Sequence, residues 1–202
     1  MRKLSPQSYE RKRLVADEIT LVIPSIPVRG QLLARAVHSA TAQVCQPDAY
    51  SIAVDHCKLG AGPTRTRALK AATTEWVAFL DDDDELMGHH LSTLLDTALE
   101  FEADVVWPWF QVVGGTDPVP MNRGRQWDSA SPFTFPMTTL VRNELAQQCA
   151  FPEPIPNADN SGEDWAFWMQ LDALGARFRH VDEVTWFWHH DSKNTSGRPE
   201  RW

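Results

Sequence analysis

Long apolar runs are missing from this chain of 202 residues, and no stretch approaches the ~18 to 20 apolar residues of a membrane-spanning helix. The first residues, MRKLSPQSYERKR, also lack the apolar core of a secretory signal, so we expect a cytoplasmic protein. Cysteine is scarce: there are three, and no pair has the short spacing of a zinc site. These absences argue against a membrane protein, a disulfide framework and a zinc site.

Positive charge is also in the minority. The 27 acidic and 19 basic side chains give a net charge of -8, and five of the basic ones lie within residues 1–13. An acidic body disfavours indiscriminate binding to phosphate backbones, although a local basic patch could still guide a nucleic acid. We interpret residues 1–18 as a basic, partly mobile leader and residues 19–202 as a single domain.

Strand-like and helix-like segments alternate along the chain. The run ITLVI, residues 19–23, ends at Pro24 and predicts a buried strand. YSIAVD and WVAFLD predict two further strands, which end at Asp55 and Asp81. The alternation predicts an α/β fold with parallel strand pairs and right-handed crossovers. Between the first two strands, helical spacing gives one apolar face made of Leu32, Leu33, Ala36, Val37 and Ala40.

The second half of the chain continues this pattern with two irregularities. The segment HLSTLLDTALEFE places its leucines on one face and predicts a helix. DVVWPWFQVV is strand-like, but Pro108 predicts an edge position or a bulge. Residues 114–132 form a long polar interruption, which we interpret as a binding loop or lid.

Acidic residues gather where two of the predicted strands end. Asp55 ends one strand, and the consecutive aspartates Asp81–Asp84, with Glu85 behind them, follow another. In open α/β sheets, ligands bind outside the carboxyl ends of the strands. Carboxylate oxygens there suit Mg²⁺ or Mn²⁺, which binds one or two carboxylates together with substrate phosphates. The alternative is that these aspartates only end strands and start turns.

A second acidic pair, Glu163 and Asp164, opens the helix-like segment that follows Gly162. Acids in a first helical turn suit the helix dipole, so a structural role is one interpretation. A carboxylate held there could also act as a general base that removes a proton from a hydroxyl. The two roles are compatible.

Histidines and tryptophans supply further candidates. His189 and His190 follow an aromatic strand, and a histidine near a carboxylate-bound cation could complete its coordination. A partly buried, hydrogen-bonded histidine is the alternative. Several of the nine tryptophans lie near predicted strand or helix ends, where a flat ring could carry a sugar or a base by stacking. These are Trp107, Trp109, Trp165 and Trp188.

Five segments, taken in order, resemble the family 2 glycosyltransferases of the GT-A fold. They are TLVIPSIPVRGQLLARAVHSATAQ, AVDH, GAGPTRTRALKAATTEWVAFLDDDDEL, GEDWAFWMQLDALG and FWHHDSKNTS. The third runs into the family's D-x-D motif, and the fourth resembles its acceptor-side Glu-Asp motif. The resemblance implies a Rossmann-like mixed sheet flanked by helices, the nucleotide-diphospho-sugar transferase fold. Residues 19–86 would form the nucleotide-sugar half and residues 87–202 the acceptor half.

On the donor side, the resemblance implies roles for individual residues. Ser25 and Asp55 would contact the uridine or an equivalent nucleoside, and Arg65 would lie near it. Asp81 would touch the ribose or the metal. Asp83 would bind the metal that bridges the diphosphate.

On the acceptor side, the resemblance implies a second set of roles. Asp164 would be the base that deprotonates the acceptor hydroxyl, with Glu163 and Trp165 beside it in binding the substrate. His190, or alternatively His189, would assist the metal or the phosphates.

The activity that the resemblance implies is metal-dependent, inverting sugar transfer by a hexosyl- or pentosyltransferase. The donor would be a nucleotide-diphosphate sugar, in the first place a UDP-sugar, and the cofactor Mn²⁺ or Mg²⁺. The acceptor hydroxyl could lie on a glycan, a lipid, a protein or a modified DNA base. DNA stays open because the acceptor half contains Arg123, Arg125, Arg142, Arg177 and Arg179.

Two other functions remain open from the residues alone. Nucleotidyl or phosphoryl transferases also place carboxylates and a metal beside a nucleotide, but they commonly have a glycine-rich phosphate loop near the first strand. The corresponding segment here, PSIPVRG, has one glycine. A non-catalytic nucleotide-sugar-binding module would keep the fold, although the presence of both Asp83 and Asp164 argues against it.

Overall fold

The structure is a computed structural model that describes residues 17–133, 135–153 and 162–189. The strands are β1 (Ile19–Ser25), β2 (Ala49–Val54), β3 (Trp76–Phe79), β4 (Glu85–Leu86), β5 (Val105–Val113), β6 (Leu140–Arg142) and β7 (Phe178–His189). The α-helices are α1 (Gly30–Thr41), α2 (Ala61–Lys70), α3 (His90–Glu100), α4 (Asn143–Ala146) and α5 (Glu163–Ala173). Two 3-10 turns are η3 (Pro27–Arg29) and η4 (Pro120–Asn122). No helix in these ranges has the length and apolar character that crossing a membrane requires.

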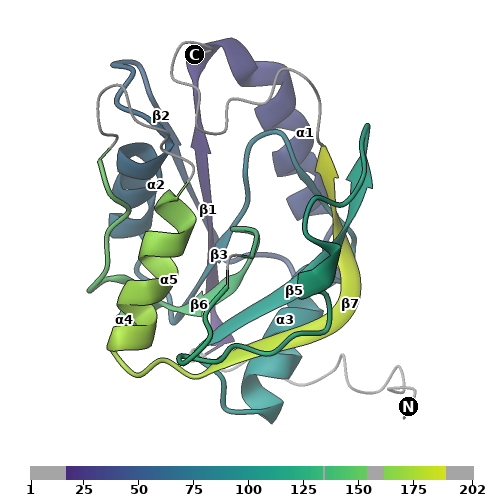
Figure 1. Ribbon diagram of the computed structural model, residues 1–202. Helices are drawn as coiled ribbons and strands as arrows, with labels where there is room; N and C mark the ends of the chain where they lie inside the picture. The colour runs from purple at the N-terminus through teal and green to yellow at the C-terminus, as the bar shows by residue number, and fades with distance from the viewer. Residues whose placement is uncertain (1–16, 134, 154–161, 190–202) are drawn as a thin grey trace.

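The strands form one mixed sheet in the order β2-β1-β3-β6-β5-β7-β4. β1 pairs in parallel with β2 and β3, which confirms the alternation predicted for the first half. β6 lies antiparallel between β3 and β5, while β5 and β7 are parallel to one another. The helices cover both faces, with α2, α4 and α5 on one side and α1 and α3 on the other (Figure 1).

Strand β1 lies between β2 and β3, and its burial on both faces explains its largely apolar sequence. Successive side chains of a strand point to opposite faces. Ile19, Leu21 and Ile23 pack into the core on the side of α1 and α3, whereas Val22 packs into the core on the side of α2 and α5. A sheet covered on both faces therefore favours apolar residues on both sides of this strand, and the buried Thr20 hydroxyl is hydrogen-bonded to that of Thr74.

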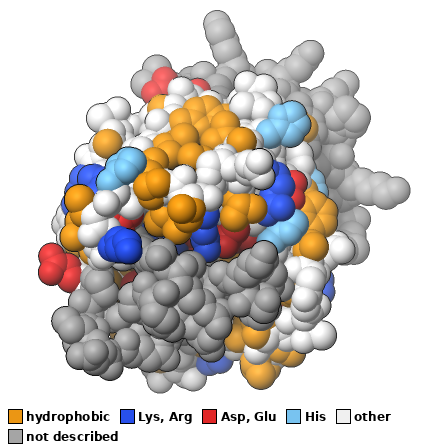
Figure 2. Space-filling model, turned by 90° about the horizontal axis from the view of Figure 1, so that it is seen from above, with side chains coloured by type: hydrophobic (Ala, Val, Ile, Leu, Met, Phe, Trp, Pro, Cys, Tyr) orange, Lys and Arg blue, Asp and Glu red, His pale blue; other side chains and the backbone are white. Residues whose placement is uncertain are grey.

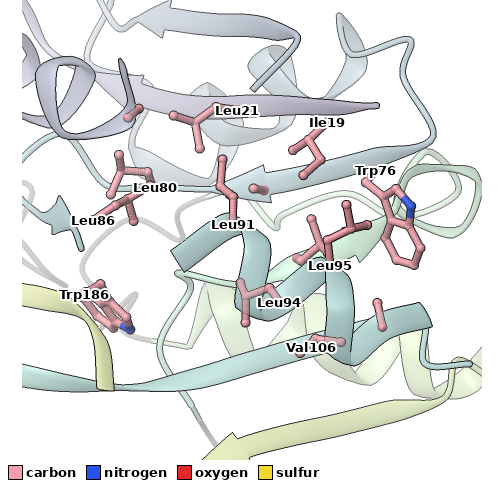
Figure 3. Packing of buried hydrophobic residues seen from close by; sticks show 14 of the residues in the cluster. Ile19, Leu21, Trp76, Leu80, Leu86, Leu91, Leu94, Leu95, Val106 and Trp186 are labelled. Carbon is pink, nitrogen blue, oxygen red and sulfur yellow. The ribbon is translucent and has the colours of Figure 1, made fainter. Parts of the chain in front are cut away.

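Helix α3 forms much of the core beneath the sheet. Leu91, Leu94, Leu95 and Ala98 are buried on one face of the helix, as its spacing predicted. Figure 3 shows the three leucines lying among side chains from β1, β5 and the end of β3. Burying one leucine side chain stabilises a fold by roughly 2 kcal/mol, so this helix fixes the sheet that carries the site.

The irregularity at Pro108 is a bulge. The pairing of β5 with β7 shifts in register between Trp107 and Trp109, and again between Trp109 and Phe110. β5 lies between β6 and β7, so the alternative of an edge strand was wrong. Proline cannot donate to a sheet ladder, and the bulge accommodates the missing hydrogen bond.

The polar loop, residues 114–132, is fastened to its surroundings in its second half. The Gly124 N–H donates to Nε2 of His180 at 3.0 Å, and the Gln126 side chain exchanges two hydrogen bonds with the His180 backbone. The indole of Trp127 donates to Asp172 at 2.7 Å. These contacts anchor residues 124–127 of the segment that we interpreted as a binding loop or lid.

We expect the Gly124 amide to be protected from hydrogen exchange in the ligand-free protein at neutral pH. The Nδ1 atom of His180 lies 3.0 Å from the Trp107 carbonyl oxygen, so the ring proton sits there and Nε2 is free to accept. Burial lowers the pKa of His180. Only in solution more acidic than the ordinary pKa of histidine should the ring gain a second proton and cease to accept from Gly124.

Residue-resolved amide exchange tests this anchor. Protection of Gly124 should fall in mildly acidic solution, and at every pH in a His180→Phe variant. Replacing the partly exposed His89 with Ala is the matched control and should change neither. Protection that persists in the His180→Phe protein would contradict the assignment.

Candidate active site

Parallel strands bring their carboxyl ends to one edge of the sheet. β1 ends at Ser25, Asp55 follows β2, and Asp81–Asp84 follow β3. The register places Ser25 beside Val54, so the first two of these ends adjoin. Figure 2 looks down on this face, where acidic and basic side chains lie next to one another near the middle, with hydrophobic side chains around them. The structure therefore brings together the residues predicted for the donor side.

Asp82 is buried beneath this face and holds two neighbours. The Ser25 hydroxyl donates to its Oδ2 atom at 2.6 Å, and Arg29 donates to its Oδ1 atom at 2.7 Å. Burial raises the pKa of Asp82, and Arg29 opposes part of that rise. The hydroxyl that the sequence assigned to a nucleoside is thus engaged by the aspartate cluster in this structure.

Asp81 and Asp83 are the more open members of the cluster, with side chains 35% and 21% exposed. One carboxylate oxygen of Asp83 lies 3.2 Å from Nη1 of Arg29. Burial and the neighbouring Asp81 raise the pKa of Asp83 to about 6, although Arg29 lowers it. Arg29 therefore offsets only part of the cost of burying this carboxylate and placing it beside Asp81.

The end of β7 closes the far side of the cluster. The His189 N–H donates to Asp84 at 3.0 Å, and the ring Nε2 lies 2.7 Å from Glu85. Burial and the neighbouring aspartates raise the pKa of Asp84 well above its usual value. His189 therefore holds the side chains of Asp84 and Glu85, while His190 lies outside the described residues.

Sequence reasoning missed two arginines that border the aspartates. Arg29 ends the η3 turn that follows β1 and lies against Asp82 and Asp83. Arg35 of α1 donates to the Asp83 carbonyl oxygen at 2.6 Å. The position of Arg29 directly after a strand end could have identified it, because ligand sites form there in this class of fold. No comparable sequence signal marks Arg35.

Asp55 is buried and organises the loop after β2. Its carboxylate accepts from the N–H groups of Cys57 at 3.0 Å and Gly60 at 2.9 Å. Burial alone would raise the pKa of Asp55, but the backbone donors lower it below the usual value. Gly60 has a φ of 105°, which disfavours a side chain, and it caps the start of α2. Asp55 thereby fixes the helix that carries Arg65.

Arg65 is the central cation of the site and is 4% exposed. Its Nη2 atom donates to Asp81 at 2.7 Å. Its Nη1 atom reaches Asp164 at 3.3 Å and Glu163 at 3.4 Å. Its guanidinium lies over the ring of Phe151, with 5.3 Å between the guanidinium carbon and the ring centroid. These partners differ from the nucleoside that the resemblance assigned to Arg65.

Asp164 lies in the first turn of α5. The N-cap residue of this helix, Gly162, makes no side-chain capping hydrogen bond. Burial raises the pKa of Asp164 to about 7; Arg65 lowers it, while Glu163 and Asp81 add to the rise. A carboxyl group with such a pKa is matched to proton transfer at neutral pH. The environment is therefore the one that a general base needs.

Tryptophans divide into core and candidate binding residues. Trp107 and Trp109 are 0% and 2% exposed, so their suggested role as stacking platforms was wrong. Trp107 instead stacks on Phe135, with 4.3 Å between the ring centroids. Trp165 is half-buried beside Asp164, and its ring centroid lies 6.2 Å from that of Trp127.

The carboxylates at this edge fit a hard cation held jointly with a ligand. Among the described residues, no group of three or more His, Cys, Asp or Glu side chains forms a ready metal site. Asp81 and Asp83 nevertheless offer only oxygen donors and are partly exposed. Two carboxylates completed by phosphate oxygens is the arrangement that Mg²⁺ prefers.

The acceptor-half arginines are mostly engaged in pairs away from this edge. Arg142 and Arg177 both bind Asp104, at the end of the sheet where β3 begins. Arg123 pairs with Asp182 at 2.9 Å. These pairs weigh against the basic surface that a DNA acceptor would require.

Comparison with known proteins supports the same fold and chemistry. The sequence matches the family described as glycosyl transferase family 2 over residues 34–151. A search of the curated proteins found no match. Residues 1–349 of S. aureus TarS in complex with UDP-GlcNAc match with a TM-score of 0.74 and 18% identity, over 90% of this chain and 61% of that one. The same TarS fragment with UDP matches with a TM-score of 0.71 and 19% identity, over 87% and 61%.

The chain thus spans about three fifths of the length of the TarS fragment. The predicted GT-A fold, a mixed α/β sheet flanked by helices, is confirmed. The family match includes Asp55, Arg65 and the aspartate cluster but ends before Asp164.

Proposed function

The chain belongs to glycosyl transferase family 2 and is a glycosyltransferase, and on that premise we propose that it moves a sugar from a UDP-sugar to an acceptor hydroxyl with inversion. The observation that carries the proposal is the guanidinium of Arg65. It contacts Asp81, at the predicted donor side, and Asp164, at the predicted acceptor side. Donor and acceptor would therefore meet at one place.

The proposed chemistry assigns the proton transfer to Asp164. Asp164 removes the proton of the incoming hydroxyl as that oxygen attacks the sugar carbon, and the bond from that carbon to the diphosphate breaks on the opposite side. Its pKa of about 7 suits this task at neutral pH. Direct displacement of this kind inverts the configuration at the sugar carbon.

We propose that Asp81 and Asp83 hold Mn²⁺ or Mg²⁺ together with the diphosphate. Such a cation would stabilise the negative charge that develops on the leaving diphosphate. The exposed carboxylates of both residues, and the raised pKa of Asp83, support this assignment. His190 remains a proposed helper on sequence grounds alone.

The donor proposal rests partly on the TarS structures, which hold UDP-GlcNAc and UDP. Asp55 borders the edge where the uracil would bind, while Glu163 and Trp165 border Asp164. We propose these three, with Ser25, as substrate contacts. The identity of the acceptor stays a proposal at the level of a hydroxyl, and a cytoplasmic location rests only on the sequence.

A panel of nucleotide sugars tests the function directly. UDP-GlcNAc, UDP-glucose and GDP-mannose should be compared, with and without Mn²⁺, for thermal stabilisation and for slow release of the nucleotide. We expect UDP-sugars with Mn²⁺ to raise the melting temperature by several degrees, because ligand binding to the folded state stabilises it. An absence of both stabilisation and release for every donor would overturn the proposal.

A further inference from the structure

Arg65 has more carboxylate partners than an ion pair needs. A single buried guanidinium faces Asp81 at 2.7 Å, Asp164 at 3.3 Å and Glu163 at 3.4 Å. These three partners come from two segments, about 16 and 99 positions away in sequence. One cation facing three acids leaves net negative charge, so the arrangement is poorly suited to stabilising the fold.

The guanidinium is held rigidly before any substrate binds. Below it lies the ring of Phe151, which stacks on Phe167 of α5 with 4.2 Å between the centroids. The Phe151 N–H in turn donates a hydrogen bond to the hydroxyl of Thr66 on α2 at 2.9 Å, which ties Phe151 to the helix that carries Arg65. In the described part of the chain, Nε of Arg65 is buried without a hydrogen-bond partner. Both Nη atoms are thus committed to carboxylates at the expense of Nε.

We propose that Arg65 is a positioning residue that holds the donor-side Asp81 and the acceptor-side Asp164 against one another across a single guanidinium. The inference deepens the proposed function and rests on it. Arg65 touches neither substrate in this role; it acts through the two carboxylates. A planar fork with fixed donors can bridge two carboxylates, whereas an ammonium group cannot do so with the same geometry.

A consequence is that Arg65 keeps Asp164 available as a base. The charged groups facing Asp164 are Arg65 from α2, Glu163 from α5 and Asp81 from the end of β3. Among the charged groups of the described residues, Arg65 alone favours the ionised form of Asp164. Removing the guanidinium should therefore raise the pKa of Asp164 further above about 7.

Two variants test the role. Arg65→Met keeps much of the apolar stem over Phe151 and removes the charge, while Arg65→Lys keeps the charge but loses the fork. The first measurement is a ¹³C NMR titration of the Asp164 carboxyl in cation-free, donor-free protein. We expect its midpoint to rise by about one unit or more in Arg65→Met and to stay near the wild-type value in Arg65→Lys.

The second measurement is the pH dependence of sugar transfer. In Arg65→Met the acid limb of kcat should move to higher pH, and kcat at pH 7 should fall by about 10- to 100-fold, while KM for the donor, which depends on Asp81, should rise by a smaller factor. Arg65→Lys should restore the acid limb but only part of kcat.

Each outcome decides the proposal. An unchanged Asp164 titration in Arg65→Met, or a loss of kcat without a shift of the acid limb, would overturn it and leave Arg65 a structural residue. If Arg65→Met fails to fold, Arg65→Lys decides: full wild-type kcat in that variant would overturn the bridging role. A wild-type protein without any transfer would sink the proposed function instead, and the NMR titration would still test the hold of Arg65 on Asp164.

Discussion

An Asp164→Asn protein is expected to transfer sugar about 10² to 10⁴ times more slowly than the wild type while binding the donor almost as tightly. Asparagine keeps the size of the side chain but cannot take the acceptor proton. The donor contacts lie at the ends of β1, β2 and β3, which this change leaves intact. Activity and affinity should therefore separate.

The assignment of Asp164 as the base also predicts how the transfer rate changes with pH. Asp164 acts as a base only when ionised, and its pKa is about 7 in the folded protein. The wild-type rate should therefore be low in acid, rise through about pH 7 and level off above it. The Asp164→Asn protein should keep a low rate without this rise.

Stability distinguishes catalysis from a role in the helix. If Asp164 served only the first turn of α5, asparagine would lower the free energy of unfolding by about 1 kcal/mol and leave activity intact. Burial and like charges already oppose its ionised form, so we expect a melting temperature equal to or above that of the wild type. Glu163→Gln removes a charge from the same turn and is the matched control, with an expected loss of kcat below about tenfold. An active but less stable Asp164→Asn protein would end the case for this base.

The positions of Asp55 and of the aspartate cluster could be predicted from the sequence because both depend on local pattern. A buried strand is apolar at each position, and polar residues directly after it must lie at the end of the sheet. Three such strands in parallel then place Asp55 and Asp81–Asp84 at one edge. This part of the site follows from the run of residues along the chain.

The partners of Arg65 could not be predicted in the same way. They depend on where α5 lies against α2, and the two helices are about a hundred residues apart in sequence. β6 lies antiparallel between β3 and β5. Its three residues are too few to show a hydrophobic periodicity from which that position could be predicted. Arg65 was consequently assigned to the nucleoside, whereas the structure sets it among carboxylates.

Burial also decides roles that residue type leaves open. Trp107 and Trp109 were candidate ligand platforms because they lie near a predicted strand end, yet both are buried, one in each of the two cores. Ser25 has a hydroxyl that a nucleoside could use, and in this structure it donates a hydrogen bond to the buried Asp82. Such outcomes depend on packing between elements, which the local sequence does not encode.

Replacing Asp83 is expected to abolish the cation-dependent binding of UDP and, at the same time, to stabilise the free protein. Asp83 is proposed to hold the cation, so neither Asp83→Ala nor Asp83→Asn should show a rise in melting temperature when UDP and Mn²⁺ are added. In the wild type, UDP should stabilise only when Mn²⁺ is present, because the carboxylates otherwise repel the phosphates.

The gain in stability has a defined pH dependence. The pKa of Asp83 is about 6 in the folded protein, above the usual value of a free aspartate, so ionising it destabilises the folded state. The destabilisation begins as the pH rises above about 4 and is complete above the folded pKa. Asp83→Asn removes it, and we expect the free energy of unfolding at pH 7.5 to increase by about 1 to 3 kcal/mol, with no difference near pH 3.

Denaturant unfolding without cations, followed by thermal shifts with Mn²⁺ and UDP, measures both effects on one variant. Asp182→Asn is the matched control. Asp182 is an exposed aspartate of β7 that pairs with Arg123 and is not part of the aspartate cluster. It should alter neither stability nor cation dependence by a comparable amount. Opposite changes in stability and binding are characteristic of a group retained for function, because a residue kept for the fold would lose both. An Asp83→Asn protein that is less stable than the wild type, or that still responds to Mn²⁺ and UDP, would show that Asp83 belongs to the scaffold and not to the donor site.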